Sequence, residues 1–205
     1  VIGAEYAATR RADPRLAALI HAALGDARTI VNVGAGAGSY EPRDRDVVAV
    51  EPSEVMLAQR DPGGPPAILA GACPLPFEDR SMDAAMAILT IHHWTNKAKG
   101  LAEMRRVTRG PVVLLTFDPA HRGCWLTDYL PELITLDEGQ MPVMADYARW
   151  MGPVSISPVP VPHDCSDGFL YAYWRRPRAY LDPRIRQGMS SFWKIEGAEA
   201  ALERL

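Results

Sequence analysis

The sequence predicts an α/β fold, in which helices cover both faces of a doubly wound, Rossmann-like parallel sheet. Short apolar runs rich in β-branched residues alternate with segments of helical periodicity between about residues 14 and 117. Continuous apolar runs of this kind are typical of parallel strands that are buried on both faces. Three alternating glycines follow the first run, at the end of the sheet where doubly wound folds bind ligands.

The first predicted helix begins at Pro14. Asp13 is placed as its N-cap, and proline suits the first helical position because its fixed φ matches the helix. Gly25 ends the segment. Between them, apolar residues recur at the helical spacing that packs one face on a core: Leu16, Leu19, Ile20 and Leu24.

The following apolar runs are predicted strands. They cover residues 29–33, 47–50, 67–69, 84–89 and 112–117. Two segments between them are predicted helices: residues 53–60, with Ser53 as N-cap, and residues 98–107. Strands and helices that alternate in this way form βαβ units.

The pattern changes after Phe117. The stretch VSISPVPV at residues 154–161 alternates apolar and polar residues, which predicts an edge strand, where prolines are tolerated. From Gly168 onward, an aromatic-rich segment predicts helix and loop. These aromatic side chains could form a partly helical lid over a ligand or a second layer of core.

Composition excludes several classes of protein. The chain of 205 residues carries 22 basic and 25 acidic residues, so no strong field attracts nucleic acid or an anionic membrane. No apolar run reaches the roughly 18 residues of a membrane span, and no signal peptide is evident. The three cysteines lack CxxC spacing, which favours reduced thiols and a cytoplasmic location. Nothing indicates the oligomeric state.

The glycine loop favours a nucleoside ligand over a dinucleotide. A dinucleotide fingerprint would place its third glycine at position 39, which is Ser39. Only residues 35–46 separate the first two strands, close to the roughly 10–12-residue minimum for a crossover, and Pro42 interrupts them. The long helix whose N-terminus would hold a pyrophosphate therefore does not fit.

Glu51 is a candidate ribose ligand. It ends the second strand, seventeen residues after Gly34. A carboxylate at this strand tip can accept hydrogen bonds from both hydroxyls of a ribose. Alternatively, Glu51 caps the following helix or is solvated.

Four stretches, in this order and spacing, resemble the class I S-adenosylmethionine-dependent methyltransferases, especially the small-molecule group that includes the ubiquinone/menaquinone-biosynthesis enzymes. They are VNVGAGAG, AVEPSEVMLAQR, AGACPLPFEDRSMDAAMAILTIHHW and LAEMRRVTRGPVVLLTFDP. The resemblance covers about residues 2–119 well and the rest loosely. It implies a single domain, residues 1–205, with a cofactor-binding core at 27–119 and acceptor-side and lid elements at 120–205.

The resemblance also implies the activity and the cofactor contacts. A methyl group would pass from S-adenosylmethionine to a small-molecule acceptor by in-line displacement, leaving S-adenosylhomocysteine. Glu51 would bind the ribose hydroxyls, and Pro52 and Met56 would flank the adenine. The remaining implied contacts in the strand-end loops are Gly34, Ala35 and Gly36 at the methionine part and ribose, Ala72 and Cys73 at the adenine edge, and Leu89 and Thr90 at the methionine portion. Tyr6 and either Arg10 or Arg11 would close over the cofactor, and of the two arginines we favour Arg11.

Three features depart from the family pattern. Asn32 stands where the family usually has an acid, and an amide supplies hydrogen bonds without charge. Asn32→Asp is therefore expected to tighten cofactor binding. The helix after the glycine loop is shortened, and the last strand of the family's antiparallel hairpin is expected beyond Leu205, in a chain truncated at both ends.

His92 and His93 are the candidate general bases. They follow the fourth strand on the ligand side of the sheet, and a base is needed only if the acceptor must lose a proton. A histidine pair at this position is also common as a loop-packing element in the family that the chain resembles. Two His–Cys pairs lack a partner cluster at zinc spacing, so no metal is expected: His121 with Cys124, and His163 with Cys165. Four aromatic residues could line the acceptor pocket or belong to the core: Trp125, Tyr129, Tyr171 and Trp174.

Two other functions remain open from the sequence. A nicotinamide-dependent oxidoreductase could use the same type of sheet, although Ser39 and the short crossover disfavour it. A cofactor-binding regulator or partner subunit could keep the pocket without methylating anything, and Asn32 leaves this alternative open.

Overall fold

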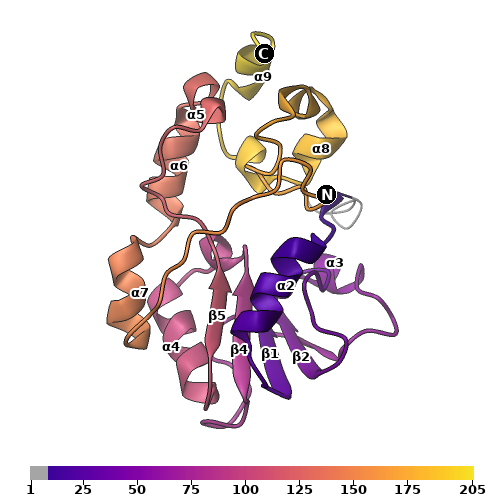
Figure 1. Ribbon diagram of the computed structural model, residues 1–205, viewed down its shortest axis with the longest axis vertical. Helices are drawn as coiled ribbons and strands as arrows, with labels where there is room; N and C mark the ends of the chain where they lie inside the picture. The colour runs from indigo at the N-terminus through magenta and orange to yellow at the C-terminus, as the bar shows by residue number, and fades with distance from the viewer. Residues whose placement is uncertain (1–8) are drawn as a thin grey trace.

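The computed structural model describes residues 9–205 and shows a five-stranded, wholly parallel sheet beneath a cap of short helices (Figure 1). Tyr6 lies outside the described residues. The strands lie in the order β3-β2-β1-β4-β5. Their bounds are β1 Thr29–Val33, β2 Asp46–Glu51, β3 Ala67–Leu69, β4 Ala84–Ile88 and β5 Val112–Leu115.

The strand order reverses at β1. Ile30 of β1 pairs with Val47 of β2 on one side and with Ala84 of β4 on the other. The chain thus runs outward to β3, returns to β4 and continues to β5. The carboxyl ends of β1 and β4 therefore meet at a topological switch point, where open α/β sheets bind ligands.

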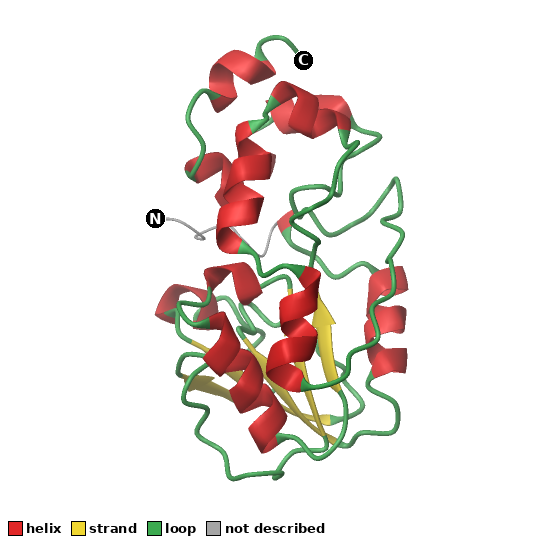
Figure 2. Cartoon of the chain, turned by 90° about the vertical axis from the view of Figure 1, so that its left-hand side faces the viewer, coloured by secondary structure: helices red, strands yellow, loops and turns green. Residues whose placement is uncertain are grey.

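Helices flank the sheet, and others form a C-terminal cap, defined here as residues 118–140 and 162–205. The flanking helices are α2 (Pro14–Ala23), α3 (Glu54–Leu57), α4 (Lys97–Val107) and α7 (Met144–Met151). The cap helices are α5 (Trp125–Tyr129), α6 (Glu132–Gln140), α8 (Pro183–Gln187) and α9 (Ala198–Leu202), with 3-10 turns η2 (Pro177–Leu181) and η3 (Ser190–Trp193). Figures 1 and 2 show the cap beyond the carboxyl ends of the strands.

Alternate strand residues build two separate cores. Ile30 and Met86 pack with α2 and with cap residues that include the fully buried Tyr180. Their neighbours Val31 and Ala87 face the other way and pack with α4 and α7. The first core thus joins the sheet directly to the cap, which fixes the cap above the strand ends.

The predicted helix at Pro14 is confirmed with its cap. Asp13 is fully buried, and its carboxylate accepts a hydrogen bond of 2.9 Å from the backbone N–H of Arg15. The same carboxylate accepts from the backbone N–H of Ser166 at 3.0 Å. The N-cap of α2 therefore also anchors the C-terminal cap of the molecule.

The crossover from β1 to β2 contains turns and no helix, in agreement with the short connection in the sequence. Tyr40 from this crossover is buried in the core beside α2, and its hydroxyl donates to Asp167 at 2.9 Å. A single buried aromatic side chain thus takes the place of a helix on this part of the sheet. The next helix, α3, is also short and has only four residues.

The predicted edge strand at residues 154–161 is wrong. This segment is extended but pairs with no strand within residues 9–205. Pro158 and Pro160 lack the N–H groups that a ladder needs, and their spacing produced much of the apparent alternation. No antiparallel strand joins the described sheet, so the position of the family's last strand stays a prediction.

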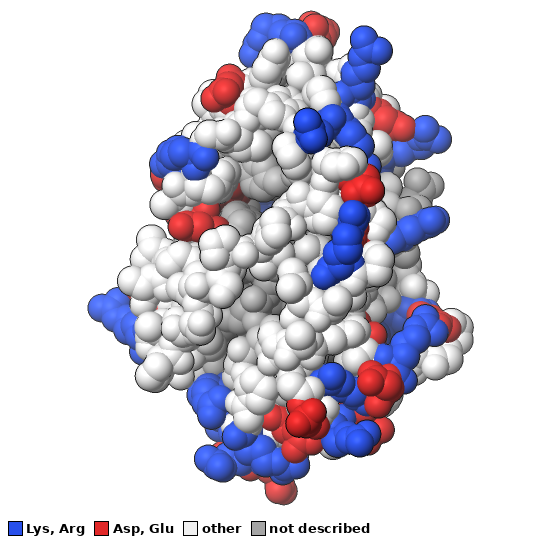
Figure 3. Space-filling view, in the orientation of Figure 1, with Lys and Arg blue, Asp and Glu red and all other residues white. Residues whose placement is uncertain are grey.

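The surface carries both signs of charge. On the face of the molecule shown in Figure 3, Lys, Arg, Asp and Glu side chains mix at the lower end and around the upper part, while a largely uncharged band crosses the middle. Ile156, at 58% exposure, belongs to the extended segment 154–161 that crosses this face. None of the helices within residues 9–205 has the length and apolar character needed to cross a membrane.

Candidate active site

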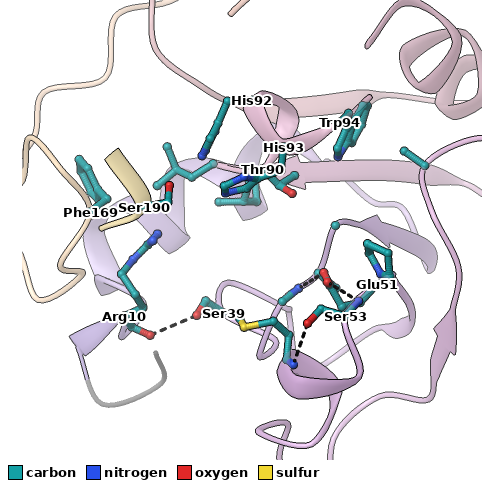
Figure 4. Close-up of a pocket in the computed structure, with 18 of the residues that line it drawn as sticks. Arg10, Ser39, Glu51, Ser53, Thr90, His92, His93, Trp94, Phe169 and Ser190 are labelled. Carbon is teal, nitrogen blue, oxygen red and sulfur yellow. Dashed lines mark hydrogen bonds between the residues drawn. The ribbon is translucent and has the colours of Figure 1, made fainter. Parts of the chain in front are cut away.

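A cavity of about 790 Å³ lies between the carboxyl ends of the strands and the cap. Figure 4 shows Thr90, His92 and His93 on one side of it, with Glu51 opposite. Arg10, Phe169 and Ser190 lie at one end, so the strand-end residues and the cap residues face the same space. A volume in the range of roughly 300–1,000 Å³ is usual for small-molecule sites.

Gly34 shows why the loop after β1 needs glycine. Its φ is +70°, and a Cβ at this position would lie 2.2 Å from the hydroxyl oxygen of Thr90. The loop therefore packs directly on Thr90, two residues after the end of β4, and a side chain here would force the two strand ends apart. At Gly34, the loop therefore presents backbone and no side chain to the cavity.

Glu51 links the glycine loop to the start of α3. Its carboxylate accepts hydrogen bonds from the backbone N–H of Gly36 at 2.8 Å and of Ser53 at 3.0 Å (Figure 4). The residue is 7% exposed and lines the cavity. Glu51 therefore hydrogen-bonds the start of α3, as the capping alternative expected, and it also lines the cavity.

Asn32 is explained by a partner that the sequence did not reveal. Its side-chain nitrogen donates to the carboxylate of Glu41 at 2.9 Å, and Glu41 forms an ion pair of 2.8 Å with Arg60. A negative charge thus lies beside position 32, supplied by a residue nine positions later. In the sequence, the only indication of this arrangement is that position 32 carries an amide where the family usually has an acid.

The histidine pair lies in η1 (Ile91–His93), directly after β4. The two ring centroids are 3.9 Å apart, and the His92 ring is 5.9 Å from that of Phe117. Within residues 9–205, the ring nitrogens of both histidines make no hydrogen bond to the protein, and both residues line the cavity. These nitrogens are therefore available to a ligand.

Both imidazoles are neutral at pH 7. Desolvation in the crowded cavity, together with the charges of His93 and nearby cations, lowers the pKa of His92 to about 3. The pKa of His93 falls to about 4 from desolvation and from the cations Lys194, Arg10 and Lys97. His93 keeps substantial exposure toward the open side of the cavity, so solvent screens it more than His92.

Cap residues close the other side of the cavity. Phe169, Leu170 and Tyr171 line it, together with Met189 and Ser190. Of the aromatic residues proposed for the acceptor pocket, only Tyr171 lines the cavity. Trp125 and Tyr129 pack against the core, and Trp174 is 40% exposed.

Tyr171 is held in place by a buried carboxylate of α6. Its hydroxyl donates to Asp137 at 2.8 Å, and His121 contacts the same oxygen at 3.0 Å. Asp137 is fully buried. Burial and the nearby Asp137 raise the pKa of Tyr171, so its hydroxyl stays protonated. This cluster fixes one wall of the cavity.

The structure gathers most of the predicted site residues around one cavity. Arg11 is exposed and does not line it, whereas the adjacent Arg10 does. Arg10 is directed inward by Asp167, whose carboxylate it contacts at 2.6 Å. The predicted residues that line the cavity are Gly34, Ala35, Gly36, Glu51, Pro52, Met56, Ala72, Cys73, Leu89, Thr90, His92 and His93.

No group of three or more His, Cys, Asp or Glu side chains in residues 9–205 is arranged to hold a metal ion. Cys73 is exposed at the cavity and Cys165 is buried, and both are free.

Comparisons with known proteins agree with this geometry. Residues 31–115, which run from β1 to β5, match a family model described as a methyltransferase domain. A crystal structure of a candidate methyltransferase from an antibiotic biosynthesis pathway of Anabaena variabilis is similar to this chain, with 34% identity and a TM-score of 0.88. The match covers 96% of this chain and 85% of that protein.

More distant structures share the fold. A protein from Thermotoga maritima described as an S-adenosylmethionine-dependent methyltransferase is 22% identical, with a TM-score of 0.54, over 66% of this chain and 69% of its own. A phosphoethanolamine N-methyltransferase from Haemonchus contortus, solved with S-adenosylhomocysteine, is 17% identical, with a TM-score of 0.55. That match covers 67% of this chain and 35% of the other.

Proposed function

The chain belongs to the class I S-adenosylmethionine-dependent methyltransferases, and from this premise we propose that its cavity binds the cofactor beside a small-molecule acceptor. The observation that carries the proposal is the single cavity shared by the glycine loop, Glu51 and the histidine pair. The cofactor's ribose and adenine would lie at the strand ends, and the acceptor would lie beneath the cap.

The residues present fit such a cofactor. Gly34 lines the cavity without a side chain, so a ligand can approach the loop backbone closely there. Glu51 offers a carboxylate to ribose hydroxyls at the end of β2, where a switch-point ligand lies. Pro52 and Met56 would cover the adenine from the α3 side, and Ala72 and Cys73 would lie at its edge.

Bound S-adenosylmethionine supplies a sulfonium that makes its methyl group electrophilic. The protein must then align the acceptor in line with the S–CH3 bond and exclude water. Residues of the cap, such as Phe169 and Tyr171, would hold and cover the acceptor. A ring nitrogen of the neutral His92 or His93 would accept a hydrogen bond from a hydroxyl acceptor, whereas the lowered pKa values of both imidazoles disfavour full proton transfer to them.

A small acceptor is favoured by the shape of the site. The cap closes over the strand ends, so the acceptor space is a cavity bounded by both halves of the chain. The Anabaena variabilis relative, with its place in an antibiotic biosynthesis pathway, also agrees with a small-molecule acceptor. The acceptor itself is not specified by the residues that line the cavity.

Transfer of a labelled methyl group tests this proposal. Purified protein is incubated with methyl-labelled S-adenosylmethionine and a cell extract divided into small-molecule and macromolecular fractions. We expect label to enter the small-molecule fraction and Glu51→Gln to abolish the transfer. Label that enters only protein or nucleic acid would contradict the proposed acceptor class.

A further inference from the structure

The lysines of this chain are few, and all of them lie around the cavity. Of the 22 basic residues only three are lysines: Lys97, Lys99 and Lys194. Lys99 lines the cavity, and the ammonium groups of the other two contact residues that line it. Within residues 9–205 none of the three forms an ion pair, whereas the arginines form many. The lysines therefore place uncompensated positive charge at the cavity.

Lys194, in the cap after η3, is held at the cavity by Gln140 of α6. Its ammonium group donates to the side-chain oxygen of Gln140 at 3.0 Å, and Gln140 lines the cavity. The amide nitrogen of Gln140 donates to the fully buried carboxylate of Asp137 at 3.4 Å. Because an ionised carboxylate only accepts hydrogen bonds, the amide oxygen is left for Lys194. The carboxylate that holds Tyr171 thus also orients the group that holds Lys194.

Lys97 reaches the cavity from the sheet side, at the start of α4. Its ammonium group donates to the backbone oxygen of Trp94 at 3.1 Å, and Figure 4 shows Trp94 on the same side of the cavity as the histidine pair. The first turn of α4 contains Lys97 and Lys99 and no acidic residue, and Asn96 caps it. Cations are unfavourable at the positive end of a helix dipole, so these lysines do not serve the helix. The helix end and the lysines together make this side of the cavity electropositive.

The two ammonium groups act on the same space beside the histidine pair. Burial and the charge of Lys97 lower the pKa of Lys194. Both lysines also add to the desolvation that lowers the pKa of His92 and of His93. Among the described residues that line the cavity, the only carboxylate is Glu51, which lies opposite and accepts from two backbone N–H groups. The space between the lysines and the histidines is therefore suited to a negatively charged group.

We infer that Lys97 and Lys194 bind an anionic group of the methyl acceptor, a carboxylate or a phosphate, so that the acceptor is an acidic small molecule. The inference rests on the proposed function. The alternative anion is the carboxylate of the cofactor itself, but Lys194 reaches the cavity from the cap, the side proposed for the acceptor. Phe117 and Phe169 line the cavity as well and would cover an apolar body attached to the anionic group.

Three small probes test the anion site directly. Benzoate and phenyl phosphate carry the two kinds of anionic group on an aromatic ring, and benzamide is the neutral counterpart of benzoate. Their Kd values are measured by NMR titration, with and without saturating S-adenosylhomocysteine, for the full chain, for Lys97→Gln and for Lys194→Gln. Neither substitution breaks an ion pair, because both lysines contact neutral oxygens. Arg43→Gln is the matched control, since it also removes one positive charge and the Arg43 side chain is 93% exposed and outside the cavity.

We expect the full chain to bind benzoate or phenyl phosphate at least about tenfold more tightly than benzamide, and this preference to shrink as the salt concentration rises. The tighter of the two anions identifies the group that the site takes. Each lysine substitution should weaken binding of that anion about three- to tenfold, as expected for a charged contact that solvent partly screens. The affinities for benzamide and for S-adenosylhomocysteine should change less than about twofold, and Arg43→Gln should change none of them.

Two results would overturn the inference. One is equal affinity for benzamide and both anions, or anion binding that neither lysine substitution weakens. The other is a loss of S-adenosylhomocysteine affinity in both variants as large as the loss for the anion, because the lysines would then hold the cofactor's carboxylate.

The product of the methyl-transfer assay gives a second test. We expect the labelled small-molecule product to be retained on an anion exchanger at pH 7, and Lys194→Arg, which keeps the charge, to transfer more label than Lys194→Gln. A labelled small-molecule product that passes through the exchanger would overturn the inference and leave the proposed function intact. Wild-type protein that neither binds S-adenosylhomocysteine nor transfers label would instead overturn the proposed function.

Discussion

Gly34 is the residue whose replacement the structure constrains most sharply. Gly34→Ala would bring a Cβ to 2.2 Å from the Thr90 hydroxyl at a φ of +70°, where side chains are strained. We expect a loss of about 2–4 kcal/mol in the free energy of unfolding, measured by denaturant titration.

Gly139→Ala is the control for this substitution. Gly139 lies in α6, where a Cβ would meet no heavy atom within 4 Å, so alanine should raise stability by about 0.5–1 kcal/mol. Equal effects of the two substitutions would contradict the close approach of the loop to Thr90.

Asn32→Asp is expected to have the reverse of the effect predicted from the sequence alone. The new carboxylate would lie about where the amide now contacts Glu41 at 2.9 Å, and two buried carboxylates this close repel each other. We expect stability to fall by about 1–3 kcal/mol at pH 7, with no gain in cofactor affinity. Adding Glu41→Gln should restore much of the stability, and a double variant less stable than Asn32→Asp alone would refute this explanation.

His92 should stay neutral over the physiological range. Its pKa of about 3 in the folded protein lies below the ordinary 6.5, so the unfolded chain binds more protons between these values. The free energy of unfolding is therefore not reduced by His92 above pH 6.5, and it decreases as the pH falls from 6.5 toward 3. The NMR signal of the His92 ring should not titrate between pH 5 and 8, whereas a midpoint near 6.5 would show that the ring is solvated.

At the scale of elements, α6 fixes a cavity wall through Asp137. Asp137→Ala would leave the buried Tyr171 hydroxyl and His121 without their common acceptor. We expect a loss of about 2–4 kcal/mol and a raised KM for the acceptor, with S-adenosylhomocysteine affinity nearly unchanged.

Glu138→Ala, on the next residue of α6, removes only an exposed ion pair with Arg122 and should cost less than about 0.5 kcal/mol. If the cofactor affinity fell together with the acceptor KM, Asp137 would support the whole cavity and not only its acceptor side.

The strands of the sheet could be predicted almost to the residue because each is a short run of mainly apolar residues, although β3 at the sheet edge is largely exposed. Residues 29–33 and 67–69 match β1 and β3. The segment 154–161 was misread because prolines can imitate a strand's alternation while removing its hydrogen bonds. The sequence of a segment does not show whether a neighbouring strand is present to pair with it.

The candidate site could be predicted in part. Residues that follow strands, such as Gly34 and Glu51, were identifiable because the topology determines where strand ends meet. Glu41 and Arg60 were not, since their roles depend on a fold that brings distant side chains together. The cap residues Phe169 and Ser190 were hidden for the same reason, because they reach the cavity from the far end of the chain.

At the scale of the whole molecule, the cavity depends on the junction between sheet and cap. A common core contains Ile30 from the sheet, Leu126 from α5 and Leu202 from α9. Asp13 and Asp167 add polar ties between the N-terminal segment and the cap. The strand ends and the cap residues that bound the cavity are therefore parts of one packed structure, and the proposed in-line transfer depends on their fixed relative position.

The central claim is that this cavity is a binding site for S-adenosylmethionine with Glu51 at the ribose, and calorimetric titration with S-adenosylhomocysteine tests it most directly. We expect saturable one-to-one binding, a loss of at least about tenfold in affinity for Glu51→Gln, and no binding of NADH. Thermal unfolding should show that the variant remains folded. Tight binding of NADH without S-adenosylhomocysteine binding, or full affinity in Glu51→Gln, would contradict the account.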